Sequence, residues 1–354
     1  MKTRSPIFVI GTERSGSNLL RSILNSHSNI AIPHPPHLIN DFFKYQHLYG
    51  DLDDDGNFRQ LVEDMVTHVR WHHHSWEIDF DSEAIFSKSK TRSILSIFEQ
   101  IYDEYCRRKN KKRWGCKSLA VIHYVGPVRE YFPGCKFIHL VRDCRDSALS
   151  FKKVFFNRHN HVYFTADRWH QEQKIAWNLV DKRLPSAEIL TVKYEDLLQD
   201  TESTVRKICV WIDEPFEQDM LTYFKKKEIG ETAALSVLWE NINAPIKRDN
   251  TQKYRKGLTF AEIGLIENIA GEELVRFGYS LDHPQSLSPD SRGQPSVSPF
   301  RLIGIYMSSY GSFLIKMISN LHRYREIYRR IRKRVIYGWI IFKRWLSHQQ
   351  ALSK

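Results

Sequence analysis

The chain has 354 residues, of which 42% are hydrophobic and 27% are charged. This composition is typical of a globular protein with a sizeable core, and it excludes a collagen-like repeat, a wholly disordered chain and a disulfide-rich scaffold. The formal net charge is +12, but residues 301–354 hold twelve Lys or Arg against one acid, Glu326. The body of the chain is therefore nearly neutral, which argues against a nucleic-acid-binding function for it.

The cysteine pattern and the apolar segments bear on the cellular compartment. Five cysteines occur, without a C-x-x-C pair. This pattern suits a protein of the reducing cytoplasm and argues against a zinc ribbon or a disulfide framework. The first apolar stretch, Ile7–Ile10, is too short for a signal peptide. No uninterrupted run of 18 apolar residues occurs, so no membrane-spanning helix is expected. We expect a cytoplasmic protein, either free or peripheral on the inner face of a membrane.

The chain begins with the pattern of a strand, a loop and a helix. Ile7–Ile10 is a continuous apolar run, typical of a strand that is buried on both faces. Residues 11–16 form a loop bounded by two glycines, and residues 18–25 carry apolar side chains at helical spacing. A second short strand is predicted at Asn29–Ile32, where Pro33 ends it.

The following elements continue as alternating helices and strands. Residues 33–110 are predicted to form a mostly helical, aromatic-rich layer on the acceptor side of the site. Strands are predicted at Trp114–Lys117, Lys136–Val141 and Glu188–Val192, with a helix from about Asp146. This order predicts an α/β, P-loop-like fold, in which helices flank a central parallel β-sheet.

Composition divides the chain into three predicted parts. Leu281–Pro299 contains four prolines and five serines, which is typical of a linker. We therefore expect a catalytic domain at residues 1–280, a linker at 281–300 and a basic, amphipathic helical tail at 301–354.

The tail has an apolar stripe along a basic helix. Such a helix suits an anionic membrane surface through residues 321–346. It equally suits docking on the body or on a second subunit, and contact with nucleic acid is a third, weaker interpretation. The stripe recurs every three or four residues and consists of Leu321, Tyr324, Tyr328, Ile331, Val335, Trp339 and Phe342.

Residues 11–18 have the glycine spacing of a phosphate-binding loop, G-x-x-x-x-G. In such loops the backbone N–H groups and the N-terminus of the next helix bind a phosphate. A nucleotidase loop carries Lys-Ser/Thr after its second glycine, for the β- and γ-phosphates and Mg²⁺. This chain has Ser17-Asn18 there, and Arg14 is the only cation in the loop. The loop is therefore predicted to bind a phosphate without handling a magnesium triphosphate.

A second anion signal occurs at residues 139–150. Arg142 follows a predicted strand at its carboxyl end, where ligands bind open α/β sheets. Ser150 lies eight residues further on, about two turns along the next helix. Arg142 and this hydroxyl could share one phosphate, with the guanidinium binding it through two hydrogen bonds. Arg145 and Asp146 could instead form a structural ion pair.

Together the two motifs resemble those of the sulfotransferases that use 3′-phosphoadenosine 5′-phosphosulfate (PAPS), over roughly residues 5–280. In that family the first loop binds the 5′-phosphosulfate, and the Arg and Ser of the second motif bind the 3′-phosphate. The resemblance implies PAPS as the sulfuryl donor and no metal ion. It implies 5′-end contacts from Arg14, Ser15, Gly16, Ser17 and Asn18, and 3′-end contacts from Arg142 and Ser150.

Three further segments fit the same resemblance. Residues 114–118 resemble the W-G-x-K-[ST] segment of the family. Residues 192–197 resemble its Y-E-D-L segment, which implies that Tyr194 lies near the adenine. A late R-K-G element closes over the 3′-phosphate in the family, and it corresponds here to Arg255, Lys256 and Gly257.

The implied reaction is in-line attack by an acceptor oxygen on sulfur, in which a base removes a proton and cations offset the developing charge. Lys117 is predicted to be the charge-stabilising lysine, with Arg14 assisting. The alternative for Lys117 is a surface lysine at the end of a strand. Soluble small-molecule members have a histidine two residues after this lysine, whereas this chain has Leu119.

The identity of the base stays open. Other branches use a glutamate after the second strand, where this chain has the proline-flanked His34 and His37. His37 is the first candidate and His34 the second, because an imidazole titrates near neutral pH. Alternatively the histidines shape the acceptor pocket and another group acts, such as Asp41. His123 is predicted to be structural, and His72-His73-His74 not to bind a metal, because adjacent side chains point in different directions.

These expectations describe a sulfotransferase that transfers a sulfuryl group from PAPS to a hydroxyl or amine on a glycan, a glycolipid or a small molecule. A phosphotransferase of the P-loop nucleoside-kinase type is an alternative, but it would need the missing loop lysine. A catalytically inactive nucleotide- or membrane-binding protein of the same fold is another.

Overall fold

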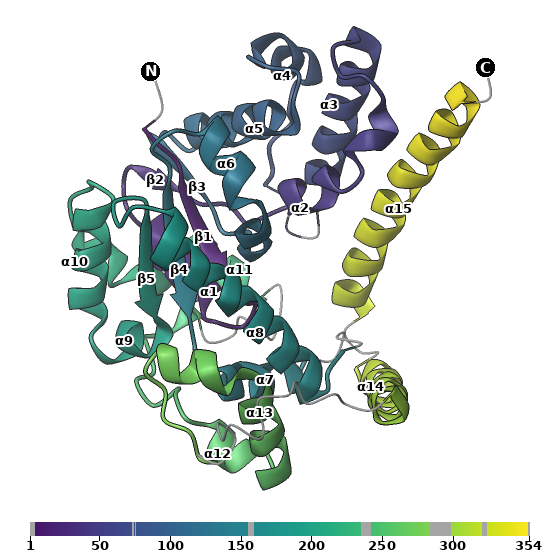
Figure 1. Ribbon diagram of the computed structural model, residues 1–354. Coiled ribbons are helices and arrows are strands. Elements are labelled where there is room, and N and C mark those ends of the chain that lie inside the picture. Colours follow the sequence, from purple (N-terminus) through teal and green to yellow (C-terminus); the bar gives the residue numbers. More distant parts are fainter. Residues whose placement is uncertain are drawn as a thin grey trace.

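The computed structural model describes residues 4–72, 74, 76–154, 159–234, 242–283, 299–320 and 324–352. Its centre is a five-stranded sheet with the strand order β2-β3-β1-β4-β5 (Figure 1). All four strand pairings are parallel, which confirms the predicted α/β fold. The strands are β1 (Ile7–Gly11), β2 (Ile30–Ala31), β3 (Arg113–Cys116), β4 (Lys136–Val141) and β5 (Ile189–Lys193).

The predicted strands lie within a residue or two of their observed bounds, and the predicted helical layer at residues 33–110 contains four α-helices. Helices pack against both faces of the sheet and make up most of the rest of the described chain. These helices are α1 (Ser17–Asn25), α2 (Leu38–Phe43), α3 (Asp55–Arg70), α4 (Ser82–Lys88), α5 (Ile94–Arg108), α6 (Val125–Tyr131), α7 (Cys144–Lys152), α8 (Val162–Asn178), α9 (Tyr194–Gln199), α10 (Thr201–Trp211), α11 (Lys227–Ala234), α12 (Tyr254–Gly257), α13 (Phe260–Arg276), α14 (Pro299–Ser319) and α15 (Tyr324–Leu352).

Strand β1 separates two hydrophobic cores. Phe8 and Ile10 belong to a core that includes α3 and α5, whereas Ile7 and Val9 belong to a core that includes α1 and α10. The four side chains have no exposed surface. Because successive side chains of a strand point to opposite faces, a continuous apolar run is required when both faces are covered. This burial fixes the position of the glycine loop that follows β1.

The tail forms two helices that lie against the body (Figure 1). Helix α15 packs beside α3 and the 3-10 helix η1 (Gln46–Tyr49). The Tyr337 hydroxyl donates to the backbone oxygen of Asp41 at 2.6 Å, and Arg344 lies 3.2 Å from the Asp64 carboxylate. The tail therefore docks on the body, which is one of the arrangements that its sequence predicted. Most of the predicted linker lies outside the described residues.

The segment Leu302–Ser319 of α14 is long and apolar enough to cross a membrane, judged by length and composition alone. Serine, glycine and Lys316 interrupt its apolar run, and the expectation that no helix spans a membrane stays a prediction. Lys316 donates to the backbone oxygen of Lys152 at 2.5 Å, which holds α14 against the end of α7.

A buried histidine in β4 predicts acid sensitivity. His139 lies 3.0 Å from the Gln173 amide oxygen and 3.3 Å from the Thr191 hydroxyl, and burial lowers its pKa to about 4. In the unfolded chain its pKa is about 6.5, so the unfolded state binds more protons below that pH. Between pH 7.5 and 5.5, His139 should lower the free energy of unfolding by about 1 kcal/mol.

Denaturant unfolding at both pH values checks this expectation. The decrease in the free energy of unfolding should be smaller in His139→Gln, which has no titrating group at that position. Equal decreases in the wild type and the variant would contradict it.

Candidate active site

The glycine loop leads from β1 into α1 and requires an unusual backbone. Gly16 precedes the first turn of α1 with φ 89°, and a Cβ atom there would lie 2.2 Å from the Tyr194 ring. Only glycine allows the loop to approach this ring so closely. Arg14 also has a positive φ, 71°, so its side chain leaves the loop in a direction that ordinary backbone would not give.

The second motif meets this loop at the same edge of the sheet. β1 and β4 are paired neighbours, with Gly11 opposite Leu140, so the loops after them leave the sheet together. Arg142 donates to the backbone oxygen of Arg14 at 3.2 Å, and Arg14 Nε donates to the Ser150 hydroxyl at 3.0 Å. Residues predicted from two motifs about 130 positions apart are thus in direct contact.

A cavity of about 360 Å³ opens at this junction. Among the predicted residues, those that line it are Arg14, Gly16, Ser17, Asn18, Arg142, Ser150 and Tyr194. Three lysines line it as well, whereas Asp146 is the only acidic residue among the described residues of its lining. The polar lining residues that were not predicted are Lys153, Lys247, Asn250 and Lys253.

Buried polar atoms at this junction fit an anionic ligand. Arg142 Nε is buried and has no hydrogen-bond partner among the described residues, and such a donor costs free energy unless a ligand satisfies it. Ser15 Oγ is likewise buried without such a partner, but Ser15 is not among the residues that line the cavity. Burial and the neighbouring charge of Arg142 lower the pKa of Arg14 to about 10. Two guanidinium groups in a partly buried site repel each other, and a bound phosphate would relieve that repulsion.

Tyr194 is the aromatic face of the cavity. The Arg142 guanidinium lies 4.5 Å from the centre of the Tyr194 ring, and Asn250 donates to the Tyr194 hydroxyl at 2.7 Å. Leu198 and Ile246 are among the apolar residues that line the same cavity. A flat aromatic ring beside apolar side chains is suited to a nucleobase.

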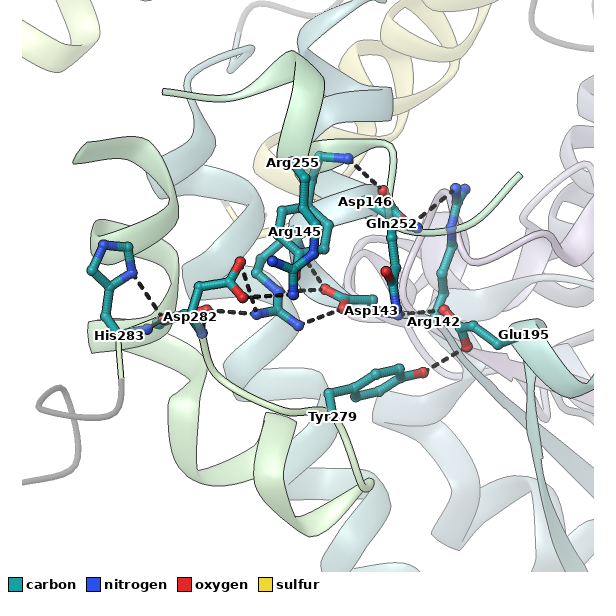
Figure 2. Close-up of polar contacts among 12 residues, drawn as sticks. Arg142, Asp143, Arg145, Asp146, Glu195, Gln252, Arg255, Tyr279, Asp282 and His283 are labelled. Atoms are coloured by element: carbon teal, nitrogen blue, oxygen red, sulfur yellow. Dashed lines mark hydrogen bonds and ion pairs between the residues drawn. The ribbon is translucent and has the colours of Figure 1, made fainter. Parts of the chain in front are cut away.

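A network of acidic residues holds the cavity wall in place (Figure 2). Asp146 accepts hydrogen bonds from the backbone nitrogens of Gln252 and Tyr254 at 2.7 and 2.9 Å. Arg145 pairs with Asp143 at 2.7 Å and with Glu267 at 2.5 Å. Arg145 is therefore a structural residue, as the alternative interpretation of this motif expected, although its partners are Asp143 and Glu267 rather than Asp146.

The predicted R-K-G element does not line this cavity. Arg255 pairs with Asp282 at 2.6 Å (Figure 2), and Lys256 is exposed. Gly257 lies against Leu149, where a Cβ atom would approach to 2.6 Å. Residues 247–253, just before this element, contribute Lys247, Asn250 and Lys253 instead. The one sequence signal for them is their concentration of polar and basic residues.

Lys117 follows β3, the neighbour of β1 on the other side from β4. Its side chain is partly buried. Burial and then the charge of Arg21 lower the Lys117 pKa to about 7, with a smaller effect of Arg14. A lysine that titrates near physiological pH in a cationic environment is an unusual surface residue. Its burial argues against the surface-lysine alternative, but Lys117 is not among the residues that line the cavity, so its role at the site stays a prediction.

His37 lies beside this lysine but does not titrate as expected. Its Nδ1 atom is 3.0 Å from the Ser118 hydroxyl, next in sequence to Lys117. Burial and then the charge of Lys333 on α15 lower its pKa to about 3. The expectation that His37 titrates near neutral pH is therefore wrong, because sequence alone showed neither its burial nor the neighbouring tail lysine.

The other candidate bases have structural partners. The backbone oxygen of His34 accepts from Trp76 at 2.7 Å, and the His34 ring is centred 4.9 Å from that of His74. Asp41 lies 3.2 Å from His68. Burial alone would raise the pKa of Asp41, but the hydrogen bond from His68 and the charges of Lys333 and other neighbours lower it overall. Asp41 is thus a charged partner of His68.

Two further predictions concerned His123 and the run His72–His74. His123 lies 3.7 Å from the Glu172 carboxylate, away from the cavity lining. Of the His72–His74 run, His73 is outside the described residues. Within the described part of the chain, no group of three or more His, Cys, Asp or Glu side chains is arranged to hold a metal ion.

Comparison with solved structures places the fold among sulfotransferases. A sulfotransferase domain from the curacin biosynthetic pathway is 18% identical, with a TM-score of 0.54 over 79% of this chain and all of that one. The sulfotransferase domain of the Synechococcus PCC 7002 olefin synthase is 21% identical, with a TM-score of 0.51 over 79% of this chain and 96% of that one. At these identities the likeness shows the fold alone.

Sequence comparison identifies the family. An uncharacterized protein of Aquifex aeolicus (strain VF5) is 25% identical over 270 residues, which are 72% of this chain. The chain spans about a third of that relative, with 31% of it covered. Residues 6–218, more than half of the chain, match the family model described as "Sulfotransferase family". The chain belongs to the sulfotransferase family.

Proposed function

We propose that this protein transfers a sulfuryl group from PAPS to a hydroxyl or amine of an acceptor. The observation that carries the proposal is the contact of Arg14 with both Arg142 and Ser150 at one cavity. Two cationic sites joined in this way match the two phosphates of a 3′,5′-substituted nucleotide. The cavity wall also holds three lysines, whose charges suit phosphate groups, and the Tyr194 ring, which suits a nucleobase.

In the proposed reaction, PAPS supplies an activated sulfuryl group. The backbone of residues 11–18 holds the 5′ end, and Arg142 and Ser150 hold the 3′-phosphate. Lys117 and Arg14 offset the negative charge on the oxygen that is released when the sulfur–oxygen bond breaks. The acceptor oxygen forms the new bond to sulfur and gives its proton to a base.

His37 remains the first candidate for that base, in its neutral form. An unprotonated imidazole can accept a proton, but a pKa of about 3 makes it a weak base. Burial and then Lys333 depress this pKa most, with smaller effects of Lys117 and His68. An acceptor that carries negative charge, or movement of α15, would bring the pKa back toward its usual value.

The acceptor is proposed to be a glycan or glycolipid. Lys333 and Tyr337 on α15 lie against the His37–Asp41 region, so this helix covers the predicted acceptor layer. The opposite side of α15 is apolar and exposed. A lipid-linked acceptor would therefore encounter the body of the protein close to His37.

Calorimetric titration of nucleotides tests the donor. We expect 3′,5′-adenosine bisphosphate (PAP) to bind without Mg²⁺ and more tightly than 5′-AMP, because only PAP engages Arg142 and Ser150. A preference for Mg–ATP would contradict the proposal and favour a nucleoside-kinase-like phosphotransferase.

The low pKa of Lys117 predicts that nucleotide binding takes up a proton. At pH 7.5 a lysine with a pKa of about 7 is mostly uncharged. The negative charge of bound PAP raises this pKa and favours the ammonium form. Wild type should therefore take up about half a proton more than Lys117→Met on binding PAP at pH 7.5.

Titrations in two buffers that differ in ionisation enthalpy measure this uptake directly. The difference between the two proteins should shrink at pH 6, where Lys117 is already charged. If the wild type and Lys117→Met take up the same number of protons at pH 7.5 and also at pH 6, Lys117 lies too far from the bound phosphates for its pKa to change.

A further inference from the structure

Helices α14 and α15 each turn an apolar stripe away from the body. On α15 the inner side carries Tyr337, Ile340 and Arg344, which contact the body or are buried. With 3.6 residues per turn, Val335 and Trp339 fall on the opposite side, and they are 63% and 55% exposed. The exposed apolar residues of this stripe are Tyr328, Ile331, Val335, Trp339, Phe342, Trp345 and Leu346.

Helix α14 repeats this arrangement. Ile305 and Ser309 are buried, and the Ser312 hydroxyl accepts a hydrogen bond from Asn160 at 3.2 Å. The opposite side of α14 is apolar, and Met307 is 71% exposed. Its other exposed apolar residues are Ile303, Tyr310, Leu314, Ile315 and Ile318. Tyr306 is part of the contact with the body, because its ring is centred 4.8 Å from that of Phe164. Two stripes of this size exceed the scattered apolar residues of an ordinary protein surface.

Basic residues flank the stripe of α15. This helix holds eight Lys or Arg and one acid. Helical spacing places Lys343 on one flank of the stripe and Arg334 on the other. Arg332 instead lies over the ring of Trp71 on the body, 4.8 Å from its centre. Lys343 lies 5.2 Å from the centre of the Trp339 ring. An apolar stripe flanked by cations, with tryptophans at one end, is the pattern of a helix that lies in the interface of a bilayer.

The charge distinguishes between occupants of this surface. A second copy of the chain would bring the cations of one α15 against those of the other, which is unfavourable. A nucleic acid would satisfy the cations but would leave the Val, Trp and Phe side chains in water. A bilayer that contains anionic lipids satisfies both, because its headgroups pair with the cations and its acyl region accepts the apolar side chains.

We propose that the outward stripe of α15 forms a membrane-binding surface that is selective for anionic lipid, to which the apolar stripe of α14 adds a second contact. The stripes bind by inserting apolar side chains below the headgroups, while the inner side of α15 keeps its contacts with the body. This binding requires no nucleotide, so it can be tested separately from the transfer reaction.

Co-sedimentation of the full chain with vesicles tests the proposal. Wild type should bind vesicles of phosphatidylcholine with phosphatidylglycerol and bind poorly to phosphatidylcholine alone. The double variant Val335→Glu, Phe342→Glu should lose binding by roughly tenfold or more, because it removes apolar contacts and adds repelling charge. The matched control is Val210→Glu, Val275→Glu, on exposed apolar positions of α10 and α13. It should bind as the wild type does.

Other outcomes overturn the proposal. Binding that is equal for the two vesicle types contradicts the selectivity for anionic lipid, and absence of binding contradicts the membrane surface itself. Light scattering on the same proteins adds a separate check. A wild-type dimer that Val335→Glu, Phe342→Glu converts to a monomer, without vesicle binding by either, would show that the stripe joins two copies of the chain.

Discussion

Replacing Arg142 with alanine is expected to weaken PAP binding by about 100-fold or more while the protein stays folded. The side chain lines the cavity and donates only long hydrogen bonds, at 3.2 and 3.4 Å, to two backbone oxygens. A phosphate in their place would accept charge-assisted hydrogen bonds, each worth about 1.5–3 kcal/mol. Calorimetry on the wild type and Arg142→Ala measures the change.

The ligand 5′-AMP is the control for this prediction, since it lacks the 3′-phosphate. Its affinity should change little in Arg142→Ala, so the ratio of the PAP and AMP affinities should collapse toward one. If both affinities fall by the same factor, Arg142 acts by holding the Arg14 backbone rather than by binding the 3′-phosphate.

Arg145 lies three residues after Arg142, but its replacement should affect stability rather than nucleotide affinity. We expect Arg145→Leu to lower the free energy of unfolding by about 3–5 kcal/mol. Arg145 is buried between Asp143 and Glu267, and the Glu267 side chain has no exposed surface. Removing the arginine takes away the cation that lies between two buried carboxylates, and Glu267 then keeps only His283 and two backbone N–H groups as partners. Denaturant unfolding followed by circular dichroism measures this loss.

The matched control is Arg206→Leu on α10. Arg206 pairs with Glu202 one turn away, and both side chains are about half exposed. Exposed pairs contribute about 0.2–1 kcal/mol, so this variant should unfold close to the wild type. If Arg145→Leu and Arg206→Leu lower the free energy of unfolding by similar amounts, the buried ion pairs of Arg145 are not what stabilises the end of β4.

Local sequence patterns predicted the sheet and the donor side of the site. An apolar run followed by glycine or arginine at a strand end is a signal contained within a short segment, at both 7–18 and 136–150. Parallel neighbours in the sheet then bring such segments together without further information. The contact between Arg14 and Ser150 follows from this topology.

Features that depend on distant segments could not be predicted in this way. The pKa of His37 depends on Lys333, almost 300 residues away in the chain. The cavity wall at Lys247, Asn250 and Lys253 is set by backbone hydrogen bonds to Asp146, whereas the sequence resemblance pointed to the element just after it. The tail stripe was recognised from its spacing, but that spacing does not show which side of the helix meets the body.

The proposed transfer reaction is tested most directly with PAPS that carries a ³⁵S label in its sulfuryl group. The labelled donor would be incubated with wild type or Lys117→Met and the lipid and polysaccharide fractions of a cell extract. We predict that wild type moves label into one of these fractions and that Lys117→Met, which still binds PAP, moves at least 100-fold less. No label above background from the wild type in either fraction, despite PAP binding, would contradict the account and identify a nucleotide-binding protein without transferase activity. Equal transfer by the two proteins would contradict the role of Lys117.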